Sequence, residues 1–246
     1  MRPATLSLFA WVLAAPCLAQ TNDAASAPQA VFERLQEAIG NDALDFQTTI
    51  ASRDEYLGMV RGTAHFAIKR PNAFRIEGSL GRATYTLVSD GQKMTIYNPL
   101  ERRFAELPAP ASQDQGLSLL VGLASAQSRI LDFVEVVREV AAGSERIEVT
   151  PAGTSTIGGR QCDHFSIVET TATRSARWEV WLEQQQTPAP CKFVVITSDG
   201  LTNDVETNEF SSKLNPVFSS EEFKFTAPAG SQQVDSVGAL GLRPAY

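Results

Sequence analysis

The chain contains 246 residues, of which 28 are acidic and 21 are basic, so its formal net charge is −7 at neutral pH. Lysine and arginine are scattered along the sequence, and this pattern argues against a nucleic acid as partner. A membrane-spanning helix needs roughly 20 consecutive apolar residues, and the sequence contains no such stretch. We therefore expect no membrane span.

The N-terminus has the pattern of a cleavable secretory signal peptide over residues 1–19. Arg2 supplies a positive start, residues 6–15 form an apolar core, and small residues lead to Ala19. Lipidation at Cys17 is the alternative, but Pro16 stands where a small residue is needed before a lipidated cysteine. Cleavage after Ala19 leaves 227 of the 246 residues and a net charge of −8. We expect one domain, exported to an oxidising compartment that is most simply the periplasm.

Cleavage also leaves two cysteines, Cys162 and Cys191, with 28 residues between them. An even number of cysteines in an oxidising compartment predicts a disulfide, which would stabilise the fold by about 3 to 4 kcal/mol. Two buried free thiols are one alternative. A metal site made from Cys162, Asp163, His164 and Cys191 is another, but this set is too weak to predict a metal.

Residues 20–29 are small and polar, which is typical of a flexible leader. Ordered structure is expected from near Pro28, where apolar residues begin to recur at helical spacing. These residues are Val31, Phe32, Leu35 and Ile39. Gly40 and Asn41 then supply a stop signal, so the pattern predicts one amphipathic helix.

From about residue 43 the hydrophobic period changes from 3.6 to 2, which is typical of strands with one covered face. Asp90-Gly91 lies between two such runs and predicts a hairpin. Strands are expected from residue 43 onward and at 62–69, 74–77, 84–87, 93–96, 146–150, 162–169, 177–183, 192–197, 204–210 and 222–225. Their short connections predict a mainly β (α+β) antiparallel meander that curls into a barrel or half-barrel, and they exclude a parallel α/β fold.

The meander is interrupted at residues 112–140, where apolar residues again recur at helical spacing and predict two short helices. The first contains Leu117, Leu120, Val121 and Ala124, and the second contains Ile130, Phe133, Val134 and Val137. We expect three helices and about eleven strands in a single domain over residues 30–228, followed by a loose tail at 229–246.

Three motifs follow one another in the first half of the chain: Lys69-Arg70-Pro71-Asn72-Ala73-Phe74, Val88-Ser89-Asp90-Gly91 and Tyr97-Asn98-Pro99. This order of an arginine-proline pair, an aromatic residue, a strand, Asp-Gly, a strand and Tyr-x-Pro resembles the LolA family, the periplasmic carriers of outer-membrane lipoproteins. The last expected strand, Phe223-Lys224-Phe225-Thr226-Ala227-Pro228, is also similar to the final strand of that family.

The second half contains Gly159-Arg160-Gln161-Cys162-Asp163-His164 and Trp178-Glu179-Val180-Trp181-Leu182, followed by Pro188-Ala189-Pro190. These motifs depart from the carrier and resemble an uncharacterised bacterial family of predicted periplasmic proteins. The two resemblances together cover nearly the whole mature chain. The chain is therefore identified as a member of that family within the LolA/LolB fold superfamily. The cysteine pair and the two tryptophans are not carrier features.

The resemblance implies an antiparallel half-barrel of about eleven strands whose apolar concave face is covered by helices that act as a lid. Nine apolar residues on repeated strand faces are the candidates for lining a ligand groove: Phe66, Ile68, Phe74, Ile76, Leu87, Met94, Ile96, Val180 and Leu182. An ordinary packed core is the alternative, because the sequence does not distinguish a filled half-barrel from a hollow one. The carrier family also implies that Arg70 closes the lid through hydrogen bonds to the helices. Its alternative role is a solvated charge at a strand end.

Trp178 and Trp181 have opposite parity in their strand. If Val180 and Leu182 face the concave side, Trp178 joins them and Trp181 lies on the outer face. There it would mark a partner surface or a shielded packing contact.

No nucleophile elbow, phosphate loop, zinc helix or paired-carboxylate pattern is convincingly placed, and His65 and His164 lie on expected strands without an evident partner. We expect a non-catalytic protein without a cofactor that reversibly sequesters a lipid or the acyl chain of an acylated protein. Apolar burial suits this role because it contributes about 0.8 kcal/mol per methylene without directional chemistry. The alternative is a regulatory module that binds an envelope protein, since half-barrels of this superfamily also occur in periplasmic regulators.

Overall fold

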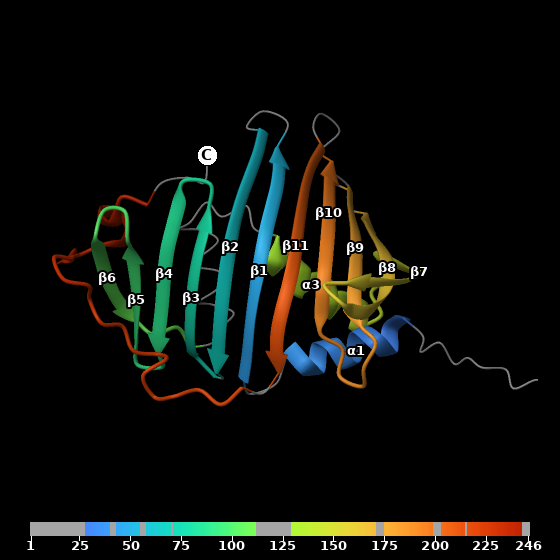
Figure 1. Ribbon diagram of the computed structural model, residues 1–246, viewed down its shortest axis with the longest axis horizontal. Helices are drawn as coiled ribbons and strands as arrows, with labels where there is room; N and C mark the ends of the chain where they lie inside the picture. Colours follow the sequence, from blue (N-terminus) through green and yellow to red (C-terminus); the bar gives the residue numbers. More distant parts are fainter. Residues whose placement is uncertain are drawn as a thin grey trace, which may run out of the picture.

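A single twelve-stranded sheet dominates the computed structural model, which describes residues 28–39, 43–54, 58–69, 71–111, 129–170, 175–198, 203–214 and 216–242 (Figure 1). The helices are α1 (Pro28–Ile39), α3 (Ile130–Ala141) and the short 3-10 helix η1 (Val237–Leu240). The strands are β1 (Ala43–Asp54), β2 (Gly58–Lys69), β3 (Ala73–Leu80), β4 (Ala83–Asp90), β5 (Lys93–Asn98), β6 (Arg103–Pro108), β7 (Ile147–Ile157), β8 (Arg160–Thr170), β9 (Ser175–Glu183), β10 (Pro190–Ser198), β11 (Asn203–Leu214) and β12 (Gln232–Gln233).

The strands pair in the order β12-β6-β5-β4-β3-β2-β1-β11-β10-β9-β8-β7. Neighbours in sequence pair antiparallel on either side of a central junction, where β1 pairs with β11. Only the two-residue β12 pairs parallel, at the β6 edge. The expected mainly antiparallel architecture with about eleven strands is therefore confirmed.

One face of the sheet is apolar and carries the helices. Cross-strand pairing places side chains in rows on this face, for example Phe46, Phe66, Ile76, Leu87 and Ile96 on β1 to β5. Helices α1 and α3 lie behind the sheet in Figure 1, over its β7–β11 half. We call this the concave face and the opposite one the outer face.

Helices α1 and α3 are each held by aromatic contacts to the concave face. Phe32 of α1 meets Phe165 edge-on, with ring centroids 5.4 Å apart. Phe133 of α3 lies 4.9 Å from Phe193 and also contacts Trp178. The amphipathic patterns at 31–39 and 130–137 were thus correctly predicted as helices, whereas the pattern at 117–124 lies outside the described residues.

The expected strand at 222–225 was wrong. Residues 219–224 form a turn in which the N–H of Glu222 binds the carbonyl of Ser219 at 3.3 Å. Phe225 packs on Tyr97 and Phe104 at the sheet edge, so the alternating phenylalanines reflect packing across a turn rather than a strand. The eleventh long strand is instead β6, which the sequence pattern missed.

The C-terminal segment is also more ordered than the loose tail we expected, over its described part to residue 242. Leu240 is fully buried. The side-chain amide of Asn98 donates to the carbonyls of Leu240 and Gly241 at 3.0 and 3.1 Å. This buried anchor, together with β12, ties the segment to the β5–β6 edge.

The predicted disulfide between Cys162 and Cys191 is present, with Cα atoms 6.8 Å apart. It joins β8 to β10 across the end of β9, where a register irregularity between Pro190 and Lys192 brings Cys191 into reach. Because the two sulfurs bond each other, neither is available as a metal ligand. The described helices contain no segment with the length and hydrophobicity of a membrane-spanning helix.

Candidate functional site

The nine groove candidates lie on the concave face. Phe66, Ile76, Leu87 and Ile96 form one cross-strand row. Ile68, Phe74 and Met94 lie in the next row, and Val180 and Leu182 belong to the β9 side of the same apolar cluster. All nine are 0–6% exposed. Their binding of a ligand stays a prediction.

The helix-covered half of the concave face contains an aromatic cluster that links three strands to α3. It consists of Phe133, Trp178, Phe193 and Phe210, with ring centroids 4.9 to 6.4 Å apart. Trp178 is 1% exposed and shares a face with Val180, as its strand parity predicted. Helix α3 therefore covers an aromatic surface through Phe133, and its removal would expose that surface.

Buried polar side chains interrupt the apolar face near the start of α3. Glu206 and Asn208 on β11 and Thr48 on β1 are each at most 4% exposed. The Thr48 hydroxyl donates to the Asn208 oxygen at 3.2 Å, and the Asn208 amide donates to Glu206 Oε1 at 2.7 Å. The backbone N–H of Arg129 also donates to Oε1, at 2.8 Å. Glu206 thus joins the sheet to the beginning of α3.

Burial raises the pKa of Glu206 from 4.5 to about 7, because desolvation disfavours the charged form. The hydrogen bonds from Arg129 and Asn208 oppose this rise. The guanidinium of Arg129 is paired with Asp132 at 2.9 Å rather than with Glu206. Glu206 Oε2 has no hydrogen-bond partner among the described residues.

The sequence pattern did not reveal this cluster. In β11 apolar residues do not alternate with polar ones over the stretch Asp204-Val205-Glu206-Thr207-Asn208-Glu209. The sequence therefore does not indicate which face of this strand is buried. Only the pairing of β11 between β1 and β10 places Glu206 and Asn208 on the concave face.

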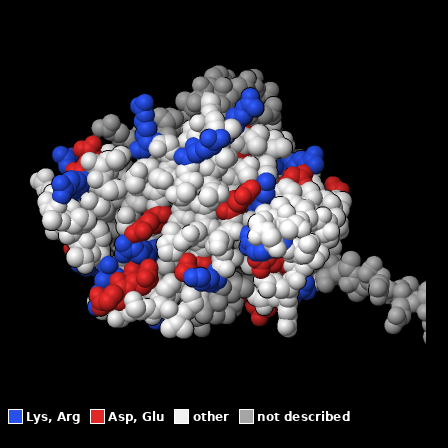
Figure 2. Space-filling model, viewed as in Figure 1, with Lys and Arg blue, Asp and Glu red and all other residues white. Residues whose placement is uncertain are grey.

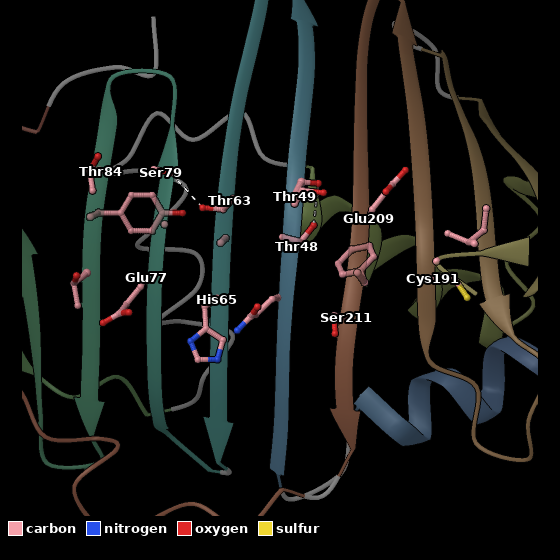
Figure 3. A pocket seen from close by; sticks show the side chains of 18 of the residues that line it. Thr48, Thr49, Thr63, His65, Glu77, Ser79, Thr84, Cys191, Glu209 and Ser211 are labelled. Carbon is pink, nitrogen blue, oxygen red and sulfur yellow. Dashed lines mark hydrogen bonds between the residues drawn. The ribbon is translucent and has the colours of Figure 1, made fainter. Parts of the chain in front are cut away.

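A second feature is a polar hollow of about 780 Å³ on the outer face (Figure 3). Its floor is a row of directly opposed side chains across β11, β1, β2, β3 and β4. The row comprises Glu209, Thr49, Thr63, Ser79 and Thr84. Next to it, Gln47, His65 and Glu77 form a parallel row.

One side of the hollow is formed by the tip of the β7–β8 hairpin, where Ile157, Gly158 and Arg160 lie. Gly158 and Gly159 have φ values of 55° and 80°, which permits the tight turn. Arg160 binds Glu183 at 2.7 Å and the carbonyl of Phe210. Figure 2 shows acidic and basic side chains interspersed on this face of the molecule.

Both histidines have acidic partners, contrary to the expectation from sequence. His65 lies 2.9 Å from Asp45, and His164 lies 2.7 Å from Glu179. His65 lines the outer hollow, but no hydroxyl hydrogen bond to it is found in the described part of the chain. The arrangement there is a cross-strand polar network rather than an activated nucleophile.

Trp181 lies on the outer face, as expected, and is shielded there. It stacks on His164 with centroids 4.2 Å apart, and its indole N–H donates to Ser155 at 3.1 Å. The ammonium of Lys192 lies 5.5 Å from the ring centroid. The shielded-packing interpretation of Trp181 therefore fits better than an open partner surface. Arg70 and the expected signal peptide lie outside the described residues.

Three solved structures resemble this chain at low sequence identity. LprF from Mycobacterium bovis is 10% identical, covers 83% of this chain and 97% of its own, and has a TM-score of 0.46. A LolA superfamily protein from Nitrosomonas europaea is 10% identical with coverages of 80% and 97% and a TM-score of 0.34. A DUF1329 family protein from Desulfovibrio piger is 8% identical with coverages of 80% and 95% and a TM-score of 0.34. These likenesses are distant.

No protein of curated function matches the sequence. One family model, described as "Predicted periplasmic protein (DUF2092)", matches residues 38–237. This match spans most of the chain and includes all of strands β1 to β11, the Cys162–Cys191 disulfide, Trp178 and Trp181. The chain belongs to the DUF2092 family of predicted periplasmic proteins.

Proposed function

We propose that this protein binds a hydrophobic ligand, a lipid or the acyl chain of an acylated protein, reversibly and without catalysis in the periplasm. The observation that carries the proposal is the concave face, whose apolar rows run from β1 to β5 and continue on β8 to β10. Such a surface favours an alkyl chain, because each buried methylene contributes about 0.8 kcal/mol.

Helix α3 is the proposed lid over this surface. Its apolar side meets the sheet through Phe133. Among the described residues, its start is joined to the sheet by the hydrogen bond from the Arg129 N–H to Glu206, and its end is held by the Gln29 amide, which donates to the Ala141 carbonyl, and by the Arg146–Glu139 ion pair. Few directional bonds therefore need to break when α3 moves. An entering alkyl chain would replace the aromatic contacts that α3 makes, which limits the net cost of opening.

Native mass spectrometry of protein purified gently from periplasm tests this proposal. We expect a lipid bound at a one-to-one ratio, released by solvent extraction. A Phe66→Glu variant places a charge among the apolar rows and should lose the ligand, whereas Thr63→Glu, three residues earlier on the outer face of β2, should keep it. Ligand-free wild-type protein would overturn the proposal.

Binding of an envelope protein is the second candidate. It is favoured by the polar hollow on the outer face, which is wide, accessible and bounded by a hairpin tip that Arg160 holds in place. In that case Thr63→Glu, rather than Phe66→Glu, would disrupt the interaction. The same two variants therefore separate the two candidates.

A further inference from the structure

Two of the buried unpaired polar atoms in the described part of the chain lie in one row of the concave face. They are Oε2 of Glu206 and the indole Nε1 of Trp178. Glu206 is 4% exposed and Trp178 is 1% exposed. Leaving buried polar atoms unpaired costs free energy, so such atoms call for an explanation.

The two atoms belong to residues of one cross-strand row, with one residue between them. Trp178 on β9 lies opposite Val195 on β10, and Val195 lies opposite Glu206 on β11. Their backbones are therefore two strand spacings apart, about 10 Å. One atom is a donor and the other an acceptor. We call Trp178, Val195 and Glu206 the head-group row.

The start of α3 covers this row. Arg129 donates its backbone N–H to Glu206 Oε1, and the Phe133 ring lies 6.3 Å from that of Trp178. On the next strand, β1, the residue directly opposite Glu206 is Ser52, which is small and polar. The row on one side contains the apolar Val180 and Phe193 together with Asn208, and the row on the other side contains Ala176 and Thr197. An apolar site with a few convergent polar groups is the usual form of a small-molecule site.

We propose that the head-group row receives the polar head of an amphiphile whose head is neutral and both donates and accepts hydrogen bonds, such as a primary amide or a hydroxyl. This inference rests on the proposed function and specifies its ligand. Glu206 Oε2 accepts the N–H or O–H of the head, and Trp178 Nε1 donates to its oxygen. The alkyl chain lies along the apolar rows.

A carboxylate head is disfavoured in this site. It would bring a second negative charge beside Glu206, and the Arg129 guanidinium, whose positive charge acts on Glu206, is already paired with Asp132. An ester head should bind more weakly than an amide for another reason, since it offers an acceptor to Trp178 but no donor to Glu206. Among ligands with alkyl chains of equal length, we therefore expect the affinity to fall in the order amide, ester, carboxylate.

Three probes of equal chain length test this order: dodecanamide, methyl dodecanoate and dodecanoate. Binding is measured by native mass spectrometry and by displacement of an uncharged fluorescent lipid, at about pH 8, above the pKa of about 7 for Glu206. We expect the amide to bind about tenfold or more tightly than the ester, because a hydrogen bond to a buried charged group has that effect. The carboxylate should bind most weakly.

Two variants assign the effect to the row. Glu206→Gln removes the charge while keeping an acceptor, and should strengthen dodecanoate binding by about tenfold. Trp178→Phe keeps an aromatic ring but removes the donor, and should weaken the amide and the ester alike. Glu209→Gln, on the outer face of β11, is the matched control for Glu206→Gln. It should change neither the ratio of amide to ester affinity nor the ratio of amide to carboxylate affinity.

The outcomes separate the two proposals. If none of the probes binds the wild-type protein, the proposed function fails. If the probes bind but the wild-type protein does not rank their heads, or if Glu206→Gln leaves the ratio of dodecanamide to dodecanoate unchanged, this inference fails while the proposed function stands.

Discussion

The buried carboxyl of Glu206 predicts that the protein becomes less stable as the pH rises from about 4.5 to about 7. Its pKa is raised in the folded state, so the folded protein holds this proton over a range in which the unfolded chain has released it. The contribution of Glu206 to the free energy of unfolding is therefore fully present below pH 4.5 and is lost as the pH rises through about 7. Each pKa unit corresponds to about 1.4 kcal/mol, so the total loss is about 3 kcal/mol.

Urea unfolding at several pH values between about 4.5 and 8, with the disulfide intact, measures this loss. Glu206→Gln keeps the acceptor for the Arg129 N–H but does not titrate, so its stability relative to wild type should rise by about 3 kcal/mol over the same range. The other ionisable groups are common to both proteins and cancel in the difference. Glu209→Gln should follow the wild-type curve. Parallel curves for wild type and Glu206→Gln would refute the reasoning.

Three further predictions concern stability. Gly62→Ala would place a Cβ 2.0 Å from the backbone oxygen of Ser79 and should cost about 1 to 3 kcal/mol or more in urea unfolding, because a backbone atom cannot yield as a side chain can. Cys162→Ser combined with Cys191→Ser should lower the unfolding free energy by about 3 kcal/mol, and a reductant should have the same effect on wild type alone. Asn98→Ala removes both side-chain hydrogen bonds to the C-terminal segment and should increase cleavage of that segment in limited proteolysis.

Matched controls make these predictions specific. Gly238→Ala meets no atom within 4 Å and should be nearly neutral, so an equal loss at Gly62 and Gly238 would contradict the steric argument. The double serine variant should not respond to reductant. For the C-terminal segment, Ser236→Ala alters an exposed side chain that makes no capping hydrogen bond and should leave proteolysis unchanged, whereas equal protection of Asn98→Ala and wild type would count against the anchor.

Strand alternation predicted one face of the sheet well, because many of its residues are marked by their own neighbours in sequence. Ile76, for example, lies between Arg75 and Glu77 in sequence and opposite Phe66 and Leu87 in the sheet. The disulfide was also predictable, since it follows from two cysteines and an oxidising compartment. In both cases the signal is local or compositional.

The remaining features depend on contacts between distant segments. Glu206 is buried because β11 pairs with β1, more than 150 positions earlier in the chain, and nothing in the polar β11 sequence marks that face. The alternation of Phe223 and Phe225 gave a false strand, because Phe225 packs on the sheet edge from a turn. The outer hollow likewise depends on where the β7–β8 hairpin tip lies relative to β11.

The central claim is that the ligand lies on the concave face of the sheet. Photo-crosslinking with an uncharged alkyl-diazirine lipid, followed by peptide mapping at residue resolution, tests it most directly. We predict adducts on concave-facing residues such as Phe66, Ile96 and Phe193, and competition by unlabelled lipid. Adducts confined to outer-face residues such as Thr63 and Glu209, or labelling that unlabelled lipid does not reduce, would contradict the claim.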